Sequence, residues 1–192
     1  MNEIENYFDQ QASSWDKNEK HTEEEKIALL NKLNLKVGDI VLDIACGTGV
    51  ISGLIHNITK SDVLGIDISQ NMINIAQEKY KNEKWAYFKK EDFLSFNENR
   101  FDYAIIYNAY PHFLDVEALA NKLSSVLKKG GHFAIIHSLS RAQLDKIHSQ
   151  KANHVSRTLS SPKEESKYFN KLFKIENAYE DDHSYLIIGE KR

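Results

Sequence analysis

The sequence predicts an α/β fold, with a mostly parallel sheet covered by helices on both faces. Short apolar runs alternate with stretches of helical periodicity, and strands that are apolar throughout are typical of a parallel sheet buried on both sides. Near the C-terminus, "LFKIENAYEDDHSYLIIGEKR" holds two strand-like runs separated by an acidic turn, which predicts an antiparallel hairpin. The expected strands before this hairpin are residues 39–45, 62–67, 85–88, 101–107 and 132–137.

Apolar residues at helical spacing predict the helices between these strands. One helix is expected to begin near Thr48, one carries Met72 to Tyr80, and one runs from 116 to 127 and is closed by Gly130-Gly131. The first 38 residues are predicted to be amphipathic helices, because Thr22 and Glu25 have capping-box spacing before an apolar run. We expect one domain over 1–192, with a lid (1–38), a cofactor-binding core (39–140), and a substrate-side helix with the hairpin (141–192).

Composition excludes several classes of protein. The chain has 192 residues and 41% hydrophobic content, which suits one domain of ordinary size. Its 25 basic and 28 acidic residues give a net charge of −3, so nucleic acid is not an expected partner. A single cysteine and an N-terminus without a basic-then-apolar leader predict a cytoplasmic protein. No apolar run approaches the roughly 20 residues of a membrane span. The oligomeric state stays open.

The stretch "VLDIACGTGV" (41–50) places an acid in a buried strand and small residues directly after it. Ligands of parallel sheets bind beyond the carboxyl ends of the strands, and the loop after the first strand usually lies there. Ala45, Gly47 and Gly49 let the backbone approach a ligand closely, and the following helix offers its first N–H groups. The pattern predicts a cradle for an elongated cofactor.

Two cofactors compete for this cradle. Gly47-x-Gly49-x-x-Ser52, with Asp67 20 residues after Gly47, is close to a dinucleotide fingerprint, so an NAD(P)-dependent oxidoreductase is one alternative. Asp43 would repel a pyrophosphate but suits a cofactor with an amino group and a sulfonium. A third acid, Asp92, follows the third predicted strand. The set therefore favours S-adenosylmethionine.

The ordered segments "VLDIACGTG", "LGIDISQNMI", "KKEDF", "FDYAIIYNAYPHF" and "LKKGGHFAIIH" resemble the motifs of class I, Rossmann-like S-adenosylmethionine-dependent methyltransferases. The resemblance covers about residues 37 to 140 and is strongest to small bacterial enzymes that act on small molecules. It implies a seven-stranded sheet in the order 3-2-1-4-5-7-6 with the last strand antiparallel. Ala45 stands where many members have their first glycine.

The resemblance also implies cofactor contacts. The loop would line the methionine part by its backbone, Asp43 would order the loop and help hold the amino group, and Asp67 would bind the ribose hydroxyls. Ile68 and Met72 would pack on adenine. The remaining contacts are Asp92 at the adenine amine, Phe93 beside it, and Asn108 at the methionine end; the loop residues are Ala45, Cys46, Gly47 and Gly49. The Cys46 thiol itself is expected to pack, because no basic neighbour in the sequence lowers its pKa.

Polar residues after the fourth and fifth strands predict the acceptor site. His112 and His137 follow neighbouring strands in the family order, so either is a candidate general base for transfer to an O, N or S atom of a small molecule. Arg141 would bind an anionic part of that molecule. The other expected substrate contacts are Tyr110, His148, Trp15 and Tyr7, the last two from the lid.

Two alternatives remain for this region. A metal held by His112, His137 and His148 is the second hypothesis, because imidazoles bind zinc, iron or copper. "NAYPHF" also approaches the Asn/Asp-Pro-Pro-aromatic motif of enzymes that methylate bases, but its proline is out of register. We therefore expect a small-molecule acceptor, no nucleic acid and no resident metal.

Overall fold

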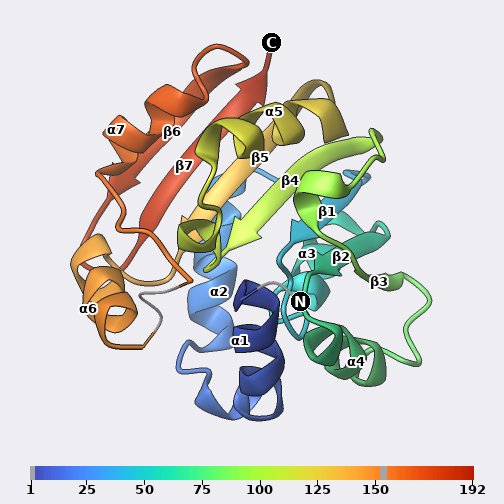
Figure 1. Cartoon of the computed structure of the whole chain (residues 1–192). Helices are drawn as coiled ribbons and strands as arrows, with labels where there is room; N and C mark the ends of the chain where they lie inside the picture. The colour runs from blue at the N-terminus through green and yellow to red at the C-terminus, as the bar shows by residue number, and fades with distance from the viewer. Residues whose placement is uncertain (1–2, 152–154) are drawn as a thin grey trace. The chain divides into compact units, whose positions relative to one another are not determined.

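The computed structural model describes residues 3–151 and 155–192, with the backbone alone for 147–151. The chain forms two compact units, residues 1–96 and 97–192, which are described separately. Within the described residues, seven strands form a sheet in the order β3-β2-β1-β4-β5-β7-β6 (Figure 1). The predicted α/β class and strand order are confirmed.

The first unit holds three parallel strands, β1 (Val41–Ile44), β2 (Val63–Asp67) and β3 (Ala86–Lys90). Every residue of β1 and β2 is buried, as their apolar sequences predict, whereas β3 is largely exposed at the edge of the sheet. The expected runs are confirmed to within two residues. The carboxyl ends of β1 and β2 lie side by side, since Ile44 pairs with Ile66.

The helices of this unit are α1 (Glu3–Gln11), α2 (Glu23–Leu30), α3 (Ser52–Thr59) and α4 (Gln70–Lys79), with 3-10 turns at Ala12–Ser14, Asp16–Asn18, Asn31–Leu33 and Phe93–Ser95. The capping box of Thr22 and Glu25 is confirmed at the start of α2. The predicted helix start near Thr48 is wrong, because α3 begins at Ser52. The Gly49 N–H instead donates to the Cys46 carbonyl at 2.9 Å, so the chain makes a tight turn before the helix.

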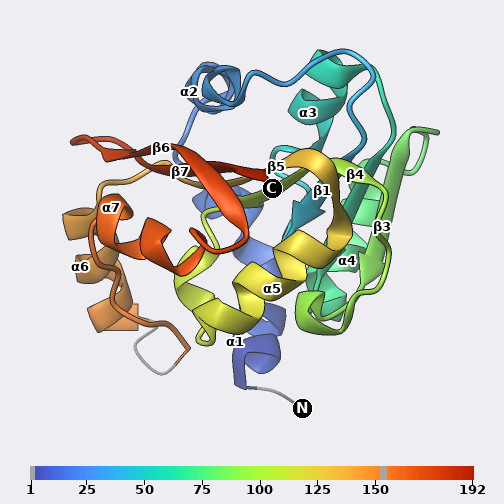
Figure 2. The same cartoon turned by 90° about the horizontal axis from the view of Figure 1, so that it is seen from above.

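The second unit holds β4 (Phe101–Tyr107), β5 (Leu127–His137), β6 (Phe173–Glu180) and β7 (Tyr185–Lys191). Strand β4 is parallel to β5, and β7 is antiparallel to both β5 and β6, which confirms the predicted hairpin. The helices are α5 (Val116–Val126), α6 (Arg141–Lys151) and α7 (Pro162–Glu165), with 3-10 turns at Tyr110–His112 and Ser166–Tyr168. Helices α5 and α7 lie on the same side of these strands (Figure 2).

Gly130-Gly131 does not close a helix, which corrects the sequence prediction. Helix α5 ends at Val126, and Leu127 already pairs with Phe101. The register with β4 shifts between Phe101 and Tyr103, so the glycines lie in an irregular stretch of β5. Gly130 has φ +74°, and a Cβ on Gly131 would lie 3.0–3.2 Å from backbone carbonyl oxygens. Strand pairing, rather than a helix cap, is what requires these glycines.

Among the residues that the structure describes, no helix has the length and apolar character needed to span a membrane.

Candidate active site

The loop after β1 adopts left-handed backbone conformations, with φ +53° at Ala45, +55° at Gly47 and +73° at Gly49. A Cβ on Gly49 would lie 3.0 Å from the rings of Phe88 and Tyr80, so this glycine is required by packing inside the unit. A Cβ on Gly47 would meet only Trp15 Nε1 at 3.6 Å and Met72 Sδ at 3.9 Å. Trp15 and Met72, two of the predicted contact residues, therefore lie beside Gly47, while the cradle itself stays a prediction.

Asp67, at the end of β2, holds this loop in place. Its Oδ2 accepts a hydrogen bond from the Gly47 N–H and its Oδ1 one from the Ser69 N–H, each at 2.8 Å. The Ile68 N–H also hydrogen-bonds this carboxylate, whose four lone pairs leave room for a further donor. Burial raises the pKa of Asp67 to about 6, although the backbone hydrogen bonds oppose that rise. The carboxylate is therefore mostly ionised at neutral pH.

Asp43 is buried in β1, and its Oδ2 accepts a hydrogen bond from Ser52 Oγ at 2.6 Å. Ser52 is the first residue of α3, so this contact fixes the start of that helix. Burial raises the pKa of Asp43 to about 7, and the nearby charge of Asp67 adds to the rise. The ordering role expected for Asp43 thus has a physical basis, while its contact with an amino group stays a prediction.

The other predicted cofactor residues of this unit differ in exposure. Cys46 is buried and burial raises the pKa of its thiol, which agrees with a packing role. Met72 and Phe93 are buried, and Ile68 is half-buried. Asp92 is exposed and caps the following 3-10 turn by accepting from the Leu94 N–H at 3.0 Å. Their predicted contacts with adenine stay predictions.

The N-terminal segment lies against the loop and against the first turn of α4. The Asp16 carboxylate accepts from the Thr48 hydroxyl and forms an ion pair with Lys79 at 2.8 Å. Asp9 accepts from the Ser69 hydroxyl and from the Asn71 N–H. Edge-to-face ring contacts join Tyr7 to Phe8 and Phe8 to Trp15, with centroids 5.2 and 5.7 Å apart. The segment predicted to be a lid therefore bonds directly to residues of the candidate cofactor site.

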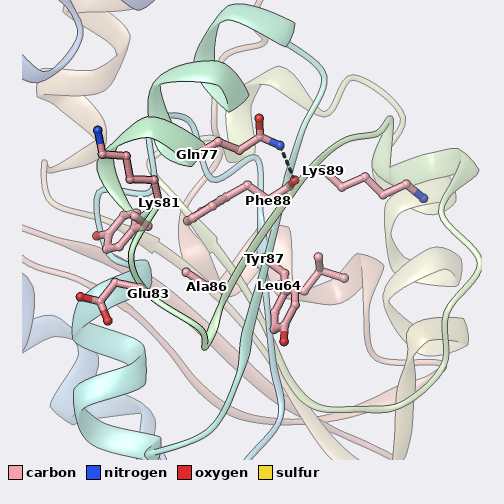
Figure 3. A pocket seen from close by; sticks show the side chains of 9 residues that line it. Leu64, Gln77, Lys81, Glu83, Ala86, Tyr87, Phe88 and Lys89 are labelled. Carbon is pink, nitrogen blue, oxygen red and sulfur yellow. Dashed lines mark hydrogen bonds between the residues drawn. The ribbon is translucent and has the colours of Figure 1, made fainter.

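A hollow of about 410 Å³ lies beside α4 and β3, and its lining includes Gln77, Lys81, Tyr87 and Lys89 (Figure 3). The Gln77 side chain donates to the Phe88 carbonyl at 3.0 Å in this region. None of the predicted site residues lines it, so it supports no role in the proposed chemistry.

In the second unit, Asn108 follows β4 with φ +55° and Ser138 follows β5. The Asn108 amide donates to Ser138 Oγ at 2.8 Å, and its Oδ1 accepts from the Ser138 N–H at 2.9 Å. These bonds join the carboxyl ends of β4 and β5. The predicted cofactor contact of Asn108 stays a prediction.

The two candidate bases have different surroundings. His112 is half-buried, and its Nδ1 lies 2.8 Å from the Val155 carbonyl oxygen. Because a carbonyl only accepts, Nδ1 carries the hydrogen, and the neutral ring has its lone pair at Nε2. His137 is fully buried at the end of β5, where its ring makes an edge contact with Tyr185. The structure thus supplies His112 with the tautomer that a base acting through Nε2 requires.

Sequence reasoning missed a buried polar network in this unit. Arg157 donates to both oxygens of Glu165 at 2.9 Å, and the Tyr110 hydroxyl donates to Glu165 at 2.7 Å. The Arg157 guanidinium also lies 4.5 Å from the centroid of the Tyr110 ring. Burial alone would raise the pKa of Glu165, but hydrogen bonds from Arg157, Tyr110 and Ser160 outweigh it and hold the pKa below its usual range. The network fixes Tyr110, a predicted substrate contact, inside the unit.

The remaining two acceptor-side candidates lie on α6. Arg141 forms an ion pair with Glu180 of β6 at 3.3 Å, and both side chains are partly exposed. The His148 side chain lies outside the described residues.

Comparison with known proteins decides the family. A family model described as "Methyltransferase domain" matches residues 35–177. The chain belongs to this family. A demethylmenaquinone methyltransferase of Bacteroides fragilis is 35% identical over 102 residues, which are 50% of this chain and 42% of the relative. An uncharacterised methyltransferase of Schizosaccharomyces pombe is 33% identical over 125 residues, which are 59% of this chain and 44% of the relative. The chain thus spans less than half the length of these relatives.

A solved structure shows the same fold. A SAM-dependent methyltransferase from Aquifex aeolicus superposes with a TM-score of 0.72 at 18% identity, covering 94% of this chain and 98% of that one. The predicted Rossmann-like methyltransferase family and its fold are therefore confirmed.

Proposed function

We propose that this methyltransferase-family chain transfers a methyl group from S-adenosylmethionine to an O, N or S atom of a small molecule. The observation that carries the proposal is the loop of residues 45–49 at the carboxyl end of β1, whose Gly47 N–H donates to Asp67 and whose backbone is left-handed at Ala45, Gly47 and Gly49. The family match favours this activity over the NAD(P)-dependent oxidoreductase alternative.

The residues that would hold the cofactor come from the first unit. Asp67 would bind the ribose hydroxyls with its remaining lone pairs, and the loop backbone would contact the methionine part. Adenine would lie among the apolar side chains of Ile68, Met72 and Phe93, with Asp92 at its amino group. When bound, the cofactor supplies an activated methyl group on a sulfonium, so the protein needs only to align the acceptor and remove a proton.

The residues that would serve the acceptor come mainly from the second unit. His112 is our first candidate for the base, because its Nδ1–H donates to Val155 and leaves Nε2 as the proton acceptor. His137 is the second candidate. Arg141 would bind an anionic group of the acceptor. It would leave its partly exposed ion pair with Glu180 to do so. In the metal alternative, His112, His137 and His148 would instead be ligands, and metal analysis of untagged protein separates the two.

The acceptor class is part of the same proposal. The name of the Bacteroides fragilis relative gives demethylmenaquinone as its acceptor, which supports a small molecule here as well. The net charge of −3 favours small acceptors over nucleic acid. A cytoplasmic location, expected from the single cysteine, belongs to this proposal. Screening small anionic and aromatic acceptors with labelled cofactor would identify the substrate.

Calorimetry with S-adenosylmethionine and with NADH tests the cofactor. Asp67→Ala removes hydrogen bonds to a charged acceptor, each worth about 1.5–3 kcal/mol, so S-adenosylmethionine affinity should fall roughly a hundredfold. Asp62→Ala, an exposed acid just before the same strand, is the matched control and should keep the parent affinity. Binding of NADH without S-adenosylmethionine would reject the methyltransferase activity. A change within about threefold in Asp67→Ala would place the ribose elsewhere.

A further inference from the structure

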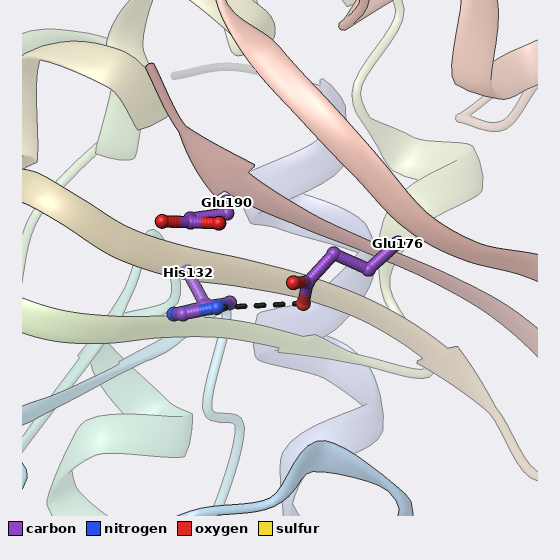
Figure 4. Close-up of side chains that lie close together, drawn as sticks. All are labelled: His132, Glu176 and Glu190. Carbon is purple, nitrogen blue, oxygen red and sulfur yellow. Dashed lines mark ion pairs between the residues drawn. The ribbon is translucent and has the colours of Figure 1, made fainter.

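We propose that His132, Glu176 and Glu190 form a site for a divalent metal ion, best suited to Zn²⁺, in the second unit. One ligand atom from each side chain lies within 4.8 Å of the others (Figure 4). His132 Nε2 is 3.4 Å from Glu176 Oε2. The three residues come from three different strands, β5, β6 and β7.

Strand pairing brings the first two ligands together. His132 and Glu190 are direct partners in the antiparallel pairing of β5 with β7. Directly paired residues project from the same face of a sheet, with Cβ atoms about 4.5–5.5 Å apart. An imidazole and a carboxylate at these positions can therefore reach a common ion.

A register irregularity supplies the third ligand. Ile175 pairs with Gly189 and Asn177 with Ile188, so Glu176 is an extra residue in β6. Such bulges turn a side chain away from the regular alternation. Figure 4 shows the Glu176 side chain directed toward His132.

The imidazole is held in an orientation that suits a ligand. Tyr103 pairs with His132 in the register of β4 with β5, and the two rings stack with centroids 5.4 Å apart and planes 17° apart. The His132 and Glu176 side chains are 32% and 39% exposed, so an ion has access from solvent.

The charges at this cluster favour a cation. Two carboxylates beside one imidazole repel each other unless the ring is protonated or an ion lies between them. Lys174, which pairs with Glu190, and Arg192, two residues after Glu190, project from the same face, and both are exposed. A metal ion would neutralise both carboxylates at a pH where the imidazole is neutral.

The donor set selects the metal. Mg²⁺ and Ca²⁺ prefer oxygen ligands alone, whereas Zn²⁺ binds imidazole nitrogen and carboxylate oxygen together at about 2.0–2.2 Å. Three protein ligands leave the fourth tetrahedral position to water.

The site is separate from the proposed acceptor chemistry. His132 precedes His137 by five residues on the same strand, which places them about 16 Å apart along β5. The inference therefore does not depend on the proposed function. A metal here would cross-link β5, β6 and β7 and stabilise the second unit.

Titration of metal-free, untagged protein with ZnCl₂ tests this site by calorimetry and by thermal unfolding. We expect one Zn²⁺ per chain and a higher unfolding temperature, with affinity at least about tenfold weaker in Glu176→Gln and in Glu190→Gln. His183→Ala, an exposed histidine in the turn between β6 and β7, is the control and should bind as the parent does.

Three results would overturn the proposal: no zinc binding by the parent, zinc binding as tight as the parent's in both glutamine variants, or loss of binding only in His112→Ala. The last would place the ion at the acceptor-side histidines. X-ray absorption of the zinc-loaded parent needs no variant. It should show one imidazole and otherwise oxygen ligands, and a sulfur ligand or two or more imidazoles would also reject the site.

Discussion

Ala45 has a small side chain but a strained backbone conformation. Its φ of +53° lies in the left-handed region, where a residue with a Cβ pays about 1–2 kcal/mol. The alanine therefore fits the loop sterically but strains its backbone, at the position where many family members have glycine.

Ala45→Gly should stabilise the protein by about 0.5–1 kcal/mol. The free energy gained by relieving the left-handed strain exceeds the free-energy cost of the extra conformational entropy that glycine gives the unfolded chain. Urea unfolding measures this directly. Ala118→Gly, in the first turn of α5, is the opposite control and should destabilise, because glycine gives the unfolded chain more conformational freedom. A loss of stability in Ala45→Gly would contradict the strain argument.

Asp43 and Asp67 make stability depend on pH. Burial raises their pKa values to about 7 and about 6, so between pH 5 and pH 7 the native state binds more protons than the unfolded state. The free energy of unfolding should therefore fall as the pH rises, by at most about 1.4 kcal/mol per pH unit for each carboxyl.

Asp43→Asn removes one of these titrations, so its slope between pH 5 and pH 7 should be shallower than that of the parent. Denaturant unfolding at pH 5, 6, 7 and 8 measures both slopes. Equal slopes would show that Asp43 is not the titrating group.

At the residue scale, sequence reasoning found Asp67 because a motif fixes its distance from Gly47 along the chain. It missed Glu165 because the bond to Tyr110 joins residues 55 positions apart. Nothing local in the sequence shows which arginine will meet that buried acid.

At the scale of elements, apolar runs predicted the strands well, since burial on both faces requires continuous apolar residues. The errors lie at their ends. Leu127 was predicted to be helical, yet pairing with Phe101 places it in β5. Tertiary pairing thus overrides local helical periodicity.

The N-terminal segment is the element whose function is most directly testable. Its hydrogen bonds through Asp9 and Asp16 reach Ser69 and Thr48 beside the proposed cofactor site. Deleting residues 1–20 should abolish methyl transfer while the rest of the chain stays folded, because a lid excludes water and completes the site. Turnover assays and circular dichroism measure the two effects.

A point variant controls for general damage to this segment. Lys90→Ala breaks the surface Glu5–Lys90 ion pair, whose lysine is 42% exposed, and should leave turnover nearly unchanged. An unchanged rate after the deletion would exclude the lid.

For the whole molecule, the sequence alone predicted the fold class and the C-terminal hairpin, and resemblance to a family supplied the strand order. The order follows from pairings between distant segments, such as β5 with β7, that no local pattern encodes. The acceptor could not be predicted for a related reason. In the proposed function, Asp67 would contact the cofactor, which the resemblance implies for the whole family, whereas His112 and Arg141 would contact the acceptor, which a family resemblance does not specify.

This division of roles between the units gives the last prediction. His112→Ala should leave S-adenosylmethionine affinity nearly intact and lower methyl transfer by about 10²- to 10⁴-fold, because the proposed base serves the acceptor rather than the cofactor. The parent rate should rise with pH through the titration of the histidine, and the variant should lose this rise. Arg141→Ala should instead raise mainly the KM for the acceptor, since an anchoring contact is made equally in the ground and transition states. Calorimetry with the cofactor and pH–rate profiles measure these effects. Parallel losses of cofactor affinity and activity in His112→Ala would reassign this histidine to cofactor binding.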